Sequence, residues 1–202
     1  MKTVFSKKKI TSSNVQSYMA EMYPNLSNKN IKNKVISSVP ALLQKNYGGA
    51  NDCTLTSLTA ILMRLTRETN ANIIYNRVER TAKVYGYTGS SGTNPLLIKK
   101  IFDDLLESLS VKKITKARYL KECGYSFNLI KQLVDAGTAI ILSMYSDGRG
   151  YYENHSVLIV GYSEYKLSNN KIKRFLIVQD NWNKDKCFID YDKLSIISSI
   201  NY

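Results

Sequence analysis

The spacing of the apolar residues changes about half way along this sequence. In the first half, leucines recur at the intervals that place them on one face of a helix, as at Leu55, Leu58, Leu62 and Leu65. In the second half, apolar runs such as "TAIILSMY" and "HSVLIVGYSEY" are typical of strands. A helical half followed by an antiparallel sheet predicts an α+β fold whose two parts enclose a cleft.

Capping and helix-breaking residues predict where the elements begin and end. We expect helices from Cys53, over "NIIYNRVERTAKVYG", from Pro95 to about residue 109, and between Ser126 and Gly137. The expected strands cover residues 111–120, 138–145, 155–165 and 173–182, followed by the segment "KCFIDYDKL".

The polar N-terminal residues 1–34 differ in composition from the rest of the chain. They contain one expected helix at about 13–22, and they could form a mobile arm, a docked helix or an inhibitory segment. We expect one domain over residues 35–202, with a helical lobe at about 35–110 and a sheet lobe at about 111–202.

Length and composition exclude several classes of protein. No apolar run approaches the roughly 18 residues of a membrane span, and no signal-peptide core follows the N-terminus, so we expect a cytoplasmic protein. Cys53, Cys123 and Cys187 are odd in number and widely spaced, which predicts free thiols. With one histidine and no CxxC motif, no metal site and no cofactor are expected.

The net charge of +13 raises nucleic acid or an anionic membrane as a partner. The lysines are nevertheless scattered along the chain, and no nucleic-acid-binding motif accompanies them. We therefore expect a solvated basic surface that favours acidic peptide or protein substrates, and no nucleic-acid partner. The oligomeric state is left open.

Cys53 lies where the loop "YGGAND" meets an apolar helix. Unpaired backbone amides and the helix dipole at such a position favour a thiolate over a thiol. The preceding Asp52 has the opposite effect if its carboxylate points at the sulfur, and no effect of that kind if it caps the helix. Taken alone, the position of Cys53 favours a structural role over a catalytic one.

His155 is the only histidine in the chain and begins an apolar strand. If Cys53 has an imidazole base, that base is therefore His155. A turn centred in "KLSNNK" pairs residues whose numbers sum to 337, which places His155 opposite Trp182 and puts Asp180 on the same face. Asp180 is then in reach to orient the imidazole, whereas a one-residue bulge would bring Asn181 there instead.

Gln44 precedes the glycine-containing loop and offers an uncharged NH2 group. With the Cys53 backbone amide, it is the candidate donor for an oxyanion, although its position also fits a surface glutamine.

The segments "VPALLQ", "GGANDCTLTSLTAIL", "LIKQLVDAGTAIILS", "NHSVLIVGY" and "FLIVQDNW", taken in order, resemble the papain-like cysteine peptidases. The resemblance spans about Val35 to Leu194 and is greatest to the bacterial branch that includes the double-glycine bacteriocin-leader peptidases. It implies a cleft between a helical lobe with Cys53 and a sheet lobe with His155. The family pattern makes Gln44 the oxyanion residue, Cys53 the nucleophile, His155 the base and acid, and Asp180 the orienting residue, with Trp182 as their shield.

The sequence thus favours a cysteine peptidase or thiol amidohydrolase that forms an acyl-enzyme. Two alternatives remain at this stage. One is an acyltransferase or transpeptidase with the same intermediate, and the other is a catalytically silent papain-like module that binds a peptide or an acidic partner.

Overall fold

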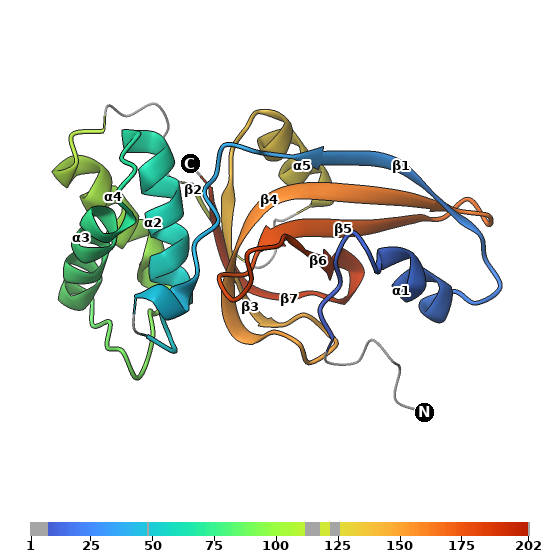
Figure 1. Cartoon of the computed structure of the whole chain (residues 1–202), viewed down its shortest axis with the longest axis horizontal. Helices are drawn as coiled ribbons and strands as arrows, with labels where there is room; N and C mark the ends of the chain where they lie inside the picture. Colours follow the sequence, from blue (N-terminus) through green and yellow to red (C-terminus); the bar gives the residue numbers. More distant parts are fainter. Residues whose placement is uncertain (1–7, 48, 112–117, 122–125, 202) are drawn as a thin grey trace.

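Three helices form one lobe of the molecule, as the sequence predicts. The computed structural model describes residues 8–47, 49–111, 118–121 and 126–201. Helices α2 (Cys53–Thr66), α3 (Ala71–Val84) and α4 (Ile98–Ser108) pack on one another at one end of the molecule (Figure 1). The short 3₁₀ helix η2 (Pro95–Leu97) leads into α4, so the expected proline start lies one turn before the α-helix.

A fourth expected helix, α5 (Phe127–Asp135), packs on the sheet lobe. Its start is capped by Ser126, whose hydroxyl accepts a hydrogen bond from the backbone N–H of Leu129 at 3.2 Å. Gly86 and Gly137 follow α3 and α5 with φ of 81° and 80°, a left-handed conformation that glycine adopts without steric cost. The expected cap and both expected glycine stops are therefore observed.

The second lobe is one antiparallel seven-stranded sheet with the strand order β2-β7-β3-β4-β5-β6, and β1 pairs with the far half of the long strand β4. The strands are β1 (Asn28–Val35), β2 (Arg118–Lys121), β3 (Ile140–Ser146), β4 (Glu153–Leu167), β5 (Ile172–Gln179), β6 (Cys187–Asp190) and β7 (Ser195–Asn201).

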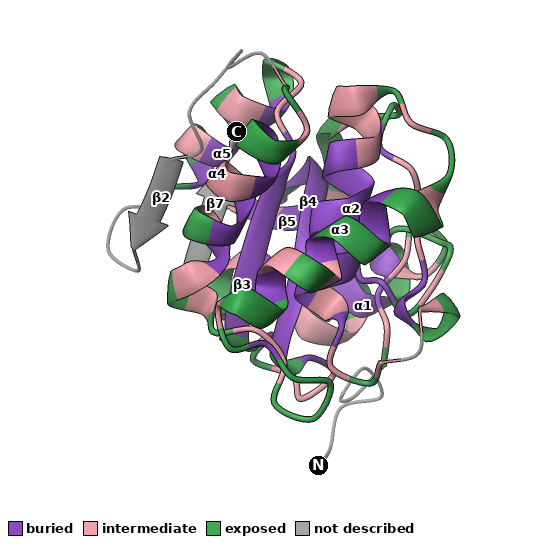
Figure 2. Ribbon diagram, turned by 90° about the vertical axis from the view of Figure 1, so that its left-hand side faces the viewer, coloured by how far each residue is buried: buried purple, intermediate pink, exposed green. Residues whose placement is uncertain are grey.

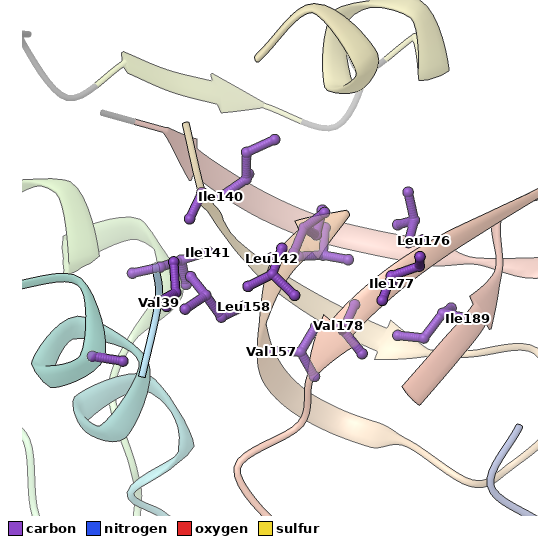
Figure 3. Close-up of a cluster of buried hydrophobic side chains, with 14 of the residues drawn as sticks. Val39, Ile140, Ile141, Leu142, Val157, Leu158, Leu176, Ile177, Val178 and Ile189 are labelled. Atoms are coloured by element: carbon purple, nitrogen blue, oxygen red, sulfur yellow. The ribbon is translucent and has the colours of Figure 1, made fainter. Parts of the chain in front are cut away.

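Apolar side chains join the two lobes. Helix α2 lies against β4 and β3, and Figure 2 shows the helices in front of the buried strands. Val39, Ile141 and Leu158 gather where the sheet meets the helical lobe (Figure 3), and each is buried. These residues belong to one apolar core that is continuous across the two lobes. Burial of each side chain of this size stabilises the folded state by about 1.5–3 kcal/mol.

The β4–β5 hairpin has the expected register at the end that matters for the site. Leu158 pairs with Gln179 and Ile159 with Val178, so the numbers sum to 337, and a register shift occurs only beyond Ile159. The strand β5 nevertheless ends at Gln179 and does not continue to Trp182 as the sequence indicated. The residues after Gln179 therefore leave the ladder and form a turn.

The N-terminal segment packs on the sheet lobe. Helix α1 (Val15–Met22) lies close to its expected range and buries Val15, Tyr18 and Met19. The strand β1 pairs with β4, so the sheet extends to residues before the expected lobe boundary at 111. Of the three alternatives for residues 1–34, a docked helix describes residues 15–22.

Other differences concern the C-terminal part of the chain. The strand β7 was not predicted, and it pairs with both β3 and β2. Of the strand expected over residues 111–120, Arg118–Lys121 form β2, whereas residues 112–117 and Cys123 lie outside the described part of the chain. Within the described part, no helix is long and apolar enough to span a membrane, and no group of three or more His, Cys, Asp or Glu side chains is placed to hold a metal ion.

Candidate active site

Cys53 is the first residue of α2 and lines a cavity of about 390 Å³ between the lobes. His155, near the start of β4, lines the same cavity. Residues 91–93, in the loop before α4, and residues 153–154, at the start of β4, also line it. The structure thus brings together the two residues that the sequence singled out for nucleophilic chemistry.

The environment of Cys53 favours the thiolate. Cys53 is partly buried, and the loss of water around its sulfur raises the pKa of the thiol. The hydrogen bond with His155 and the charge of the imidazole lower this pKa, and so do hydrogen bonds from the backbone of Ser156 and Thr54. The net result is a pKa of Cys53 below its ordinary value. A thiolate–imidazolium pair is the arrangement that makes a cysteine a nucleophile near neutral pH.

The main chain directly after strand β5 holds the imidazole of His155. Its Nε2 lies 2.8 Å from the carbonyl oxygen of Asp180. Because a carbonyl oxygen only accepts hydrogen bonds, we assign the proton to Nε2, which leaves Nδ1 for Cys53. The contact with the imidazole that the sequence assigned to the Asp180 side chain is therefore made by its backbone.

The carboxylate of Asp180 is fully buried, and none of its described hydrogen bonds goes to the imidazole. Its Oδ1 accepts hydrogen bonds from the backbone N–H groups of Trp182 and Asn183, and its Oδ2 accepts one from the hydroxyl of Tyr152 at 2.9 Å. Cys187 and the Asn183 amide also donate to Oδ2. The physical reason is the early end of β5, because the turn after Gln179 redirects the side chain from the sheet face to the turn itself.

Asn181, the alternative orienting residue, connects the two lobes. It has a left-handed backbone with φ of 62°, and its Nδ2 donates to the Cys53 carbonyl at 2.9 Å and to the Ser57 hydroxyl at 2.8 Å. The side chain therefore holds the first turn of α2 and does not contact the imidazole by any hydrogen bond described for it. The small Ser57 on the Cys53 side of the helix makes this approach possible.

Trp182 covers the imidazole, as the hairpin register indicated. Its ring centroid lies 4.1 Å from that of His155. Tyr152 lies parallel to the imidazole, with ring centroids 5.5 Å apart and an interplanar angle of 4°, and it also contacts Trp182, with centroids 5.4 Å apart. The three rings form one cluster, which fixes the orientation of the imidazole.

Gln44 begins the 3₁₀ helix η1 (Gln44–Asn46) and is buried. Its Nε2 donates to the Ala50 carbonyl at 2.9 Å, and its Oε1 has no hydrogen-bond partner in the described part of the chain. Gln44 lines a second cavity, of about 460 Å³, that shares Ala50 and Trp182 with the Cys53 cavity. It is therefore a buried residue beside the site and not a surface glutamine.

Asp52 neither caps α2 through its side chain nor contacts the sulfur by any hydrogen bond described for it. The buried carboxylate accepts hydrogen bonds from the hydroxyls of Tyr75, at 2.6 Å, and Tyr87. Both tyrosines belong to the helical lobe, so the charge is directed away from the site. The sequence left open whether the Asp52 carboxylate caps the helix or faces the sulfur, and the structure shows that it instead binds two tyrosines 23 and 35 positions further along the chain.

Several residues of the site carry no signal in the sequence. Thr54, Ser156 and Ser143 form a buried chain of hydroxyls, with 2.9 Å between each pair of oxygens, that joins α2 to β4 and β3. Tyr152 is one of 15 tyrosines, and its place against His155 depends on the fold of the loop that precedes β4. Only the pairing Met144↔His155, with Ser143 opposite Ser156, would have indicated the serine pair.

A helical lobe with a cysteine at a helix start, facing an antiparallel sheet with a histidine, is the architecture of the papain-like cysteine peptidase superfamily. Within that superfamily, this chain belongs to the Peptidase_C39 like family, whose model matches residues 36–195.

The fold is also similar to a crystal structure from Bacillus anthracis of a protein that has been assigned as a C39-like peptidase. The two share 17% sequence identity over 84% of this chain and 96% of the other, with a TM-score of 0.54. At that identity the similarity concerns the fold. No curated protein sequence gives a significant match.

Proposed function

We propose that this protein is a cysteine peptidase that cleaves a peptide or amide bond through an acyl-enzyme formed on Cys53. The observation that carries the proposal is the pairing of Cys53 with His155, which lowers the pKa of the thiol within a cavity between the lobes. Membership of the Peptidase_C39 like family supports a hydrolase of this class.

The proposed reaction begins with transfer of the Cys53 proton to Nδ1 of His155. The thiolate attacks the substrate carbonyl carbon, a C–S bond forms, and the carbonyl oxygen becomes an oxyanion. The imidazolium then protonates the leaving nitrogen as the C–N bond breaks. His155 finally takes a proton from water, whose oxygen attacks the thioester to release the carboxylic acid and restore the thiol.

The oxyanion needs hydrogen-bond donors at the start of α2. We assign the backbone N–H of Cys53 as one donor, since the first amides of a helix have no partner within it. The second is Gln44: its Nε2 carries two hydrogens, of which the Ala50 carbonyl accepts one. The substrate is a peptide or a protein segment, and the carbonyl of Asp180 orients His155 throughout.

Alkylation with limiting iodoacetamide, followed by mass spectrometry, tests the proposal without knowledge of the substrate. At about pH 6 we expect Cys53 to react much faster than Cys187, because burial and the charge of Asp180 raise the pKa of Cys187 to about 12. The variant His155→Gln should slow Cys53 by about 10²-fold or more at that pH, since it lacks the base. Equal reaction of Cys53 and Cys187 in the wild-type protein would overturn the activated-thiol assignment.

A second measurement separates hydrolysis from acyl transfer. A cleaved peptide substrate should give the free acid in the presence of added amines. Incorporation of the amine into the product would instead favour a transferase that uses the same thioester.

A further inference from the structure

The loop that joins β3 to β4 carries aromatic residues into the site. Tyr152 stacks on His155, and Tyr151 packs edge-on against Trp182, with ring centroids 6.0 Å apart. These two tyrosines are the last residues before β4 begins at Glu153. The conformation of this loop therefore determines how the imidazole and the indole are packed.

Asp147 organises this loop from its other end. Its buried carboxylate accepts hydrogen bonds from the backbone N–H groups of Arg149, at 2.9 Å, and of Tyr151, at 3.2 Å. Its backbone N–H donates to the Tyr152 carbonyl at 3.1 Å, which closes the loop. The carboxylate is also paired with the guanidinium of Arg149 at 3.0 Å, and both side chains are almost fully buried.

Arg149 in turn contacts the N-terminal segment. Its Nη1 donates to the carbonyl of Lys8 at 2.8 Å, and its guanidinium lies over the ring of Tyr18, 5.6 Å from the centroid. A buried ion pair is stable only when its remaining donors and acceptors are satisfied, and here the N-terminal segment supplies part of that environment. The loop conformation thus depends on the N-terminal segment, whose Lys8 lies 141 positions before Arg149.

The N-terminal segment is itself firmly attached to the sheet. Ile10 pairs with Phe188 of β6, whose N–H donates to the Ile10 carbonyl at 2.8 Å, and Tyr18 donates to Asp190 at 2.5 Å. Ile10 and Tyr18 are fully buried. Neither of the two cavities described above is lined by a residue of segment 8–35, so this segment lies behind the loop and does not block the site.

We propose that residues 8–22 act as a brace for the active site, and that Arg149 is the positioning residue that transmits their docking to Tyr152, His155 and Trp182. This inference rests on the proposed function, since it assigns the loop a role in the reactivity of Cys53. The brace lies outside the part of the chain, residues 36–195, that matches the family model. On this proposal, activity requires the brace to be docked.

Trp182 allows a test that does not depend on catalysis, because it is the only tryptophan in the chain and is partly exposed. In the full-length variants Arg149→Gln and Tyr18→Leu, we expect acrylamide to quench Trp182 fluorescence more strongly than in the wild type. Alkylation of Cys53 at about pH 6 should fall by about ten-fold or more, because small displacements of a catalytic group have large effects on rate. Its rate at high pH, where any thiol is ionised, should change little.

Tyr18→Phe is the matched control. It also removes the hydrogen bond to Asp190 but keeps the ring under the guanidinium, so Trp182 quenching and the pH profile of Cys53 should resemble the wild type. Arg149→Lys, which keeps the charge beside Asp147, should restore part of the low-pH reactivity lost in Arg149→Gln.

The outcomes separate the two proposals. If folded Arg149→Gln and Tyr18→Leu match the wild type in quenching and in low-pH alkylation, the brace is wrong. If Tyr18→Phe is as impaired as Tyr18→Leu, the assignment of Arg149 as the residue that transmits the docking is wrong. If Arg149→Gln does not fold, the comparison of Tyr18→Leu with Tyr18→Phe decides. A wild-type Cys53 that reacts no faster than Cys187 would instead refute the proposed function, while Trp182 quenching still reports on the brace.

Discussion

Asp180 serves the site through two different groups. Its carbonyl accepts the Nε2–H of His155, and its carboxylate fixes the turn that presents this carbonyl. The arrangement differs from a triad in which a carboxylate contacts the imidazole directly. In such a triad the side-chain charge stabilises the imidazolium, whereas here the nearest acceptor is a neutral peptide oxygen.

This difference predicts which of two substitutions at Asp180 slows the alkylation of Cys53 more. In Asp180→Asn the side-chain oxygen still accepts from the N–H groups of Trp182 and Asn183, and the amide still reaches the Tyr152 hydroxyl. We expect the low-pH alkylation rate of Cys53 to stay within about ten-fold of the wild type. Asp180→Ala removes the side-chain acceptor of both N–H groups, and we expect a loss of about 10²-fold.

The measurement is the pH profile of iodoacetamide alkylation, with thermal unfolding followed in parallel. A carboxylate that contacts the imidazole should give a different result, since its replacement by an amide has cost about 10⁴-fold in a serine protease. Loss of that size in Asp180→Asn, with the fold intact, would contradict the role assigned to the carbonyl.

Helix α2 is held to the sheet by polar contacts at its first turn. Asn181 bonds to the Cys53 carbonyl and to Ser57, and Thr54 donates to Ser156. The contacts with Ser57 and Ser156 are buried and that with the Cys53 carbonyl is partly buried, so an unpaired polar group at any of these positions would destabilise the folded state. They therefore set the distance between the helix that carries Cys53 and the strand that carries His155.

Replacement of Asn181 by glycine tests these contacts of Asn181 with α2 without backbone strain, because glycine adopts the left-handed φ of 62° freely. Loss of two buried hydrogen bonds should lower the free energy of unfolding by about 1–3 kcal/mol. Asn181→Ala should cost about 1–2 kcal/mol more, since alanine pays for the left-handed conformation. Urea unfolding measures both values, and alkylation of Cys53 should slow in each variant.

The control for this prediction is Asn170→Gly in the β4–β5 turn. Asn170 is exposed and also has a left-handed φ, of 64°, so the substitution changes the same backbone preference away from the site. We expect little change in stability or alkylation. If Asn181→Gly behaves like Asn170→Gly, the side chain of Asn181 does not hold α2.

The elements differ in how far the sequence predicts them. The helices carry long periodic patterns and local stop signals, so α2, α3, α4 and α5 lie close to their expected ranges. The short strand β7 was missed because its partners, β2 and β3, are distant in the chain and no local pattern specifies that pairing.

The site shows the same limit. Trp182 lies beside His155 as expected. The local turn does not set the register at the site, because the residue pairs near the turn sum to 338 and the irregularity between Ile159 and Gly161 restores the expected 337. The direction of the Asp180 carboxylate depends on where β5 ends, and the direction of the Asp52 carboxylate depends on tyrosines in α3 and beyond it. Such contacts between distant residues form only in the folded chain, so composition and spacing do not reveal them.

At the scale of the whole molecule, buried tyrosine hydroxyls accompany several buried carboxylates. Tyr18 bonds to Asp190, Tyr75 and Tyr87 bond to Asp52, and Tyr152 bonds to Asp180. Burial raises the pKa of each of these four hydroxyls well above the ordinary value, and the neighbouring carboxylate raises it further. The folded state therefore keeps these four protons at pH values where the unfolded chain loses them.

This difference predicts that alkali destabilises the protein. A raised pKa in the folded state contributes stability that is present below the unfolded pKa of about 10 and is lost as the pH rises beyond it. Each such tyrosine reduces the free energy of unfolding by about 1.4 kcal/mol per pH unit above pH 10, and the raised pKa of Cys187 acts in the same direction. The pKa of Cys53 is lowered in the folded state, so this residue changes the stability with pH in the opposite direction, but it is a single group.

Urea unfolding between about pH 8 and 11 should therefore give a stability that is nearly constant at first and then falls steeply. Phenolate absorbance should rise in two phases, with the buried tyrosines ionising only as the protein unfolds. Tyr75→Phe removes one of the four groups and should reduce the slope above pH 10 by about 1.4 kcal/mol per pH unit. Tyr145→Phe replaces an exposed tyrosine and should leave the slope unchanged, so equal slopes in the two variants would contradict the assignment.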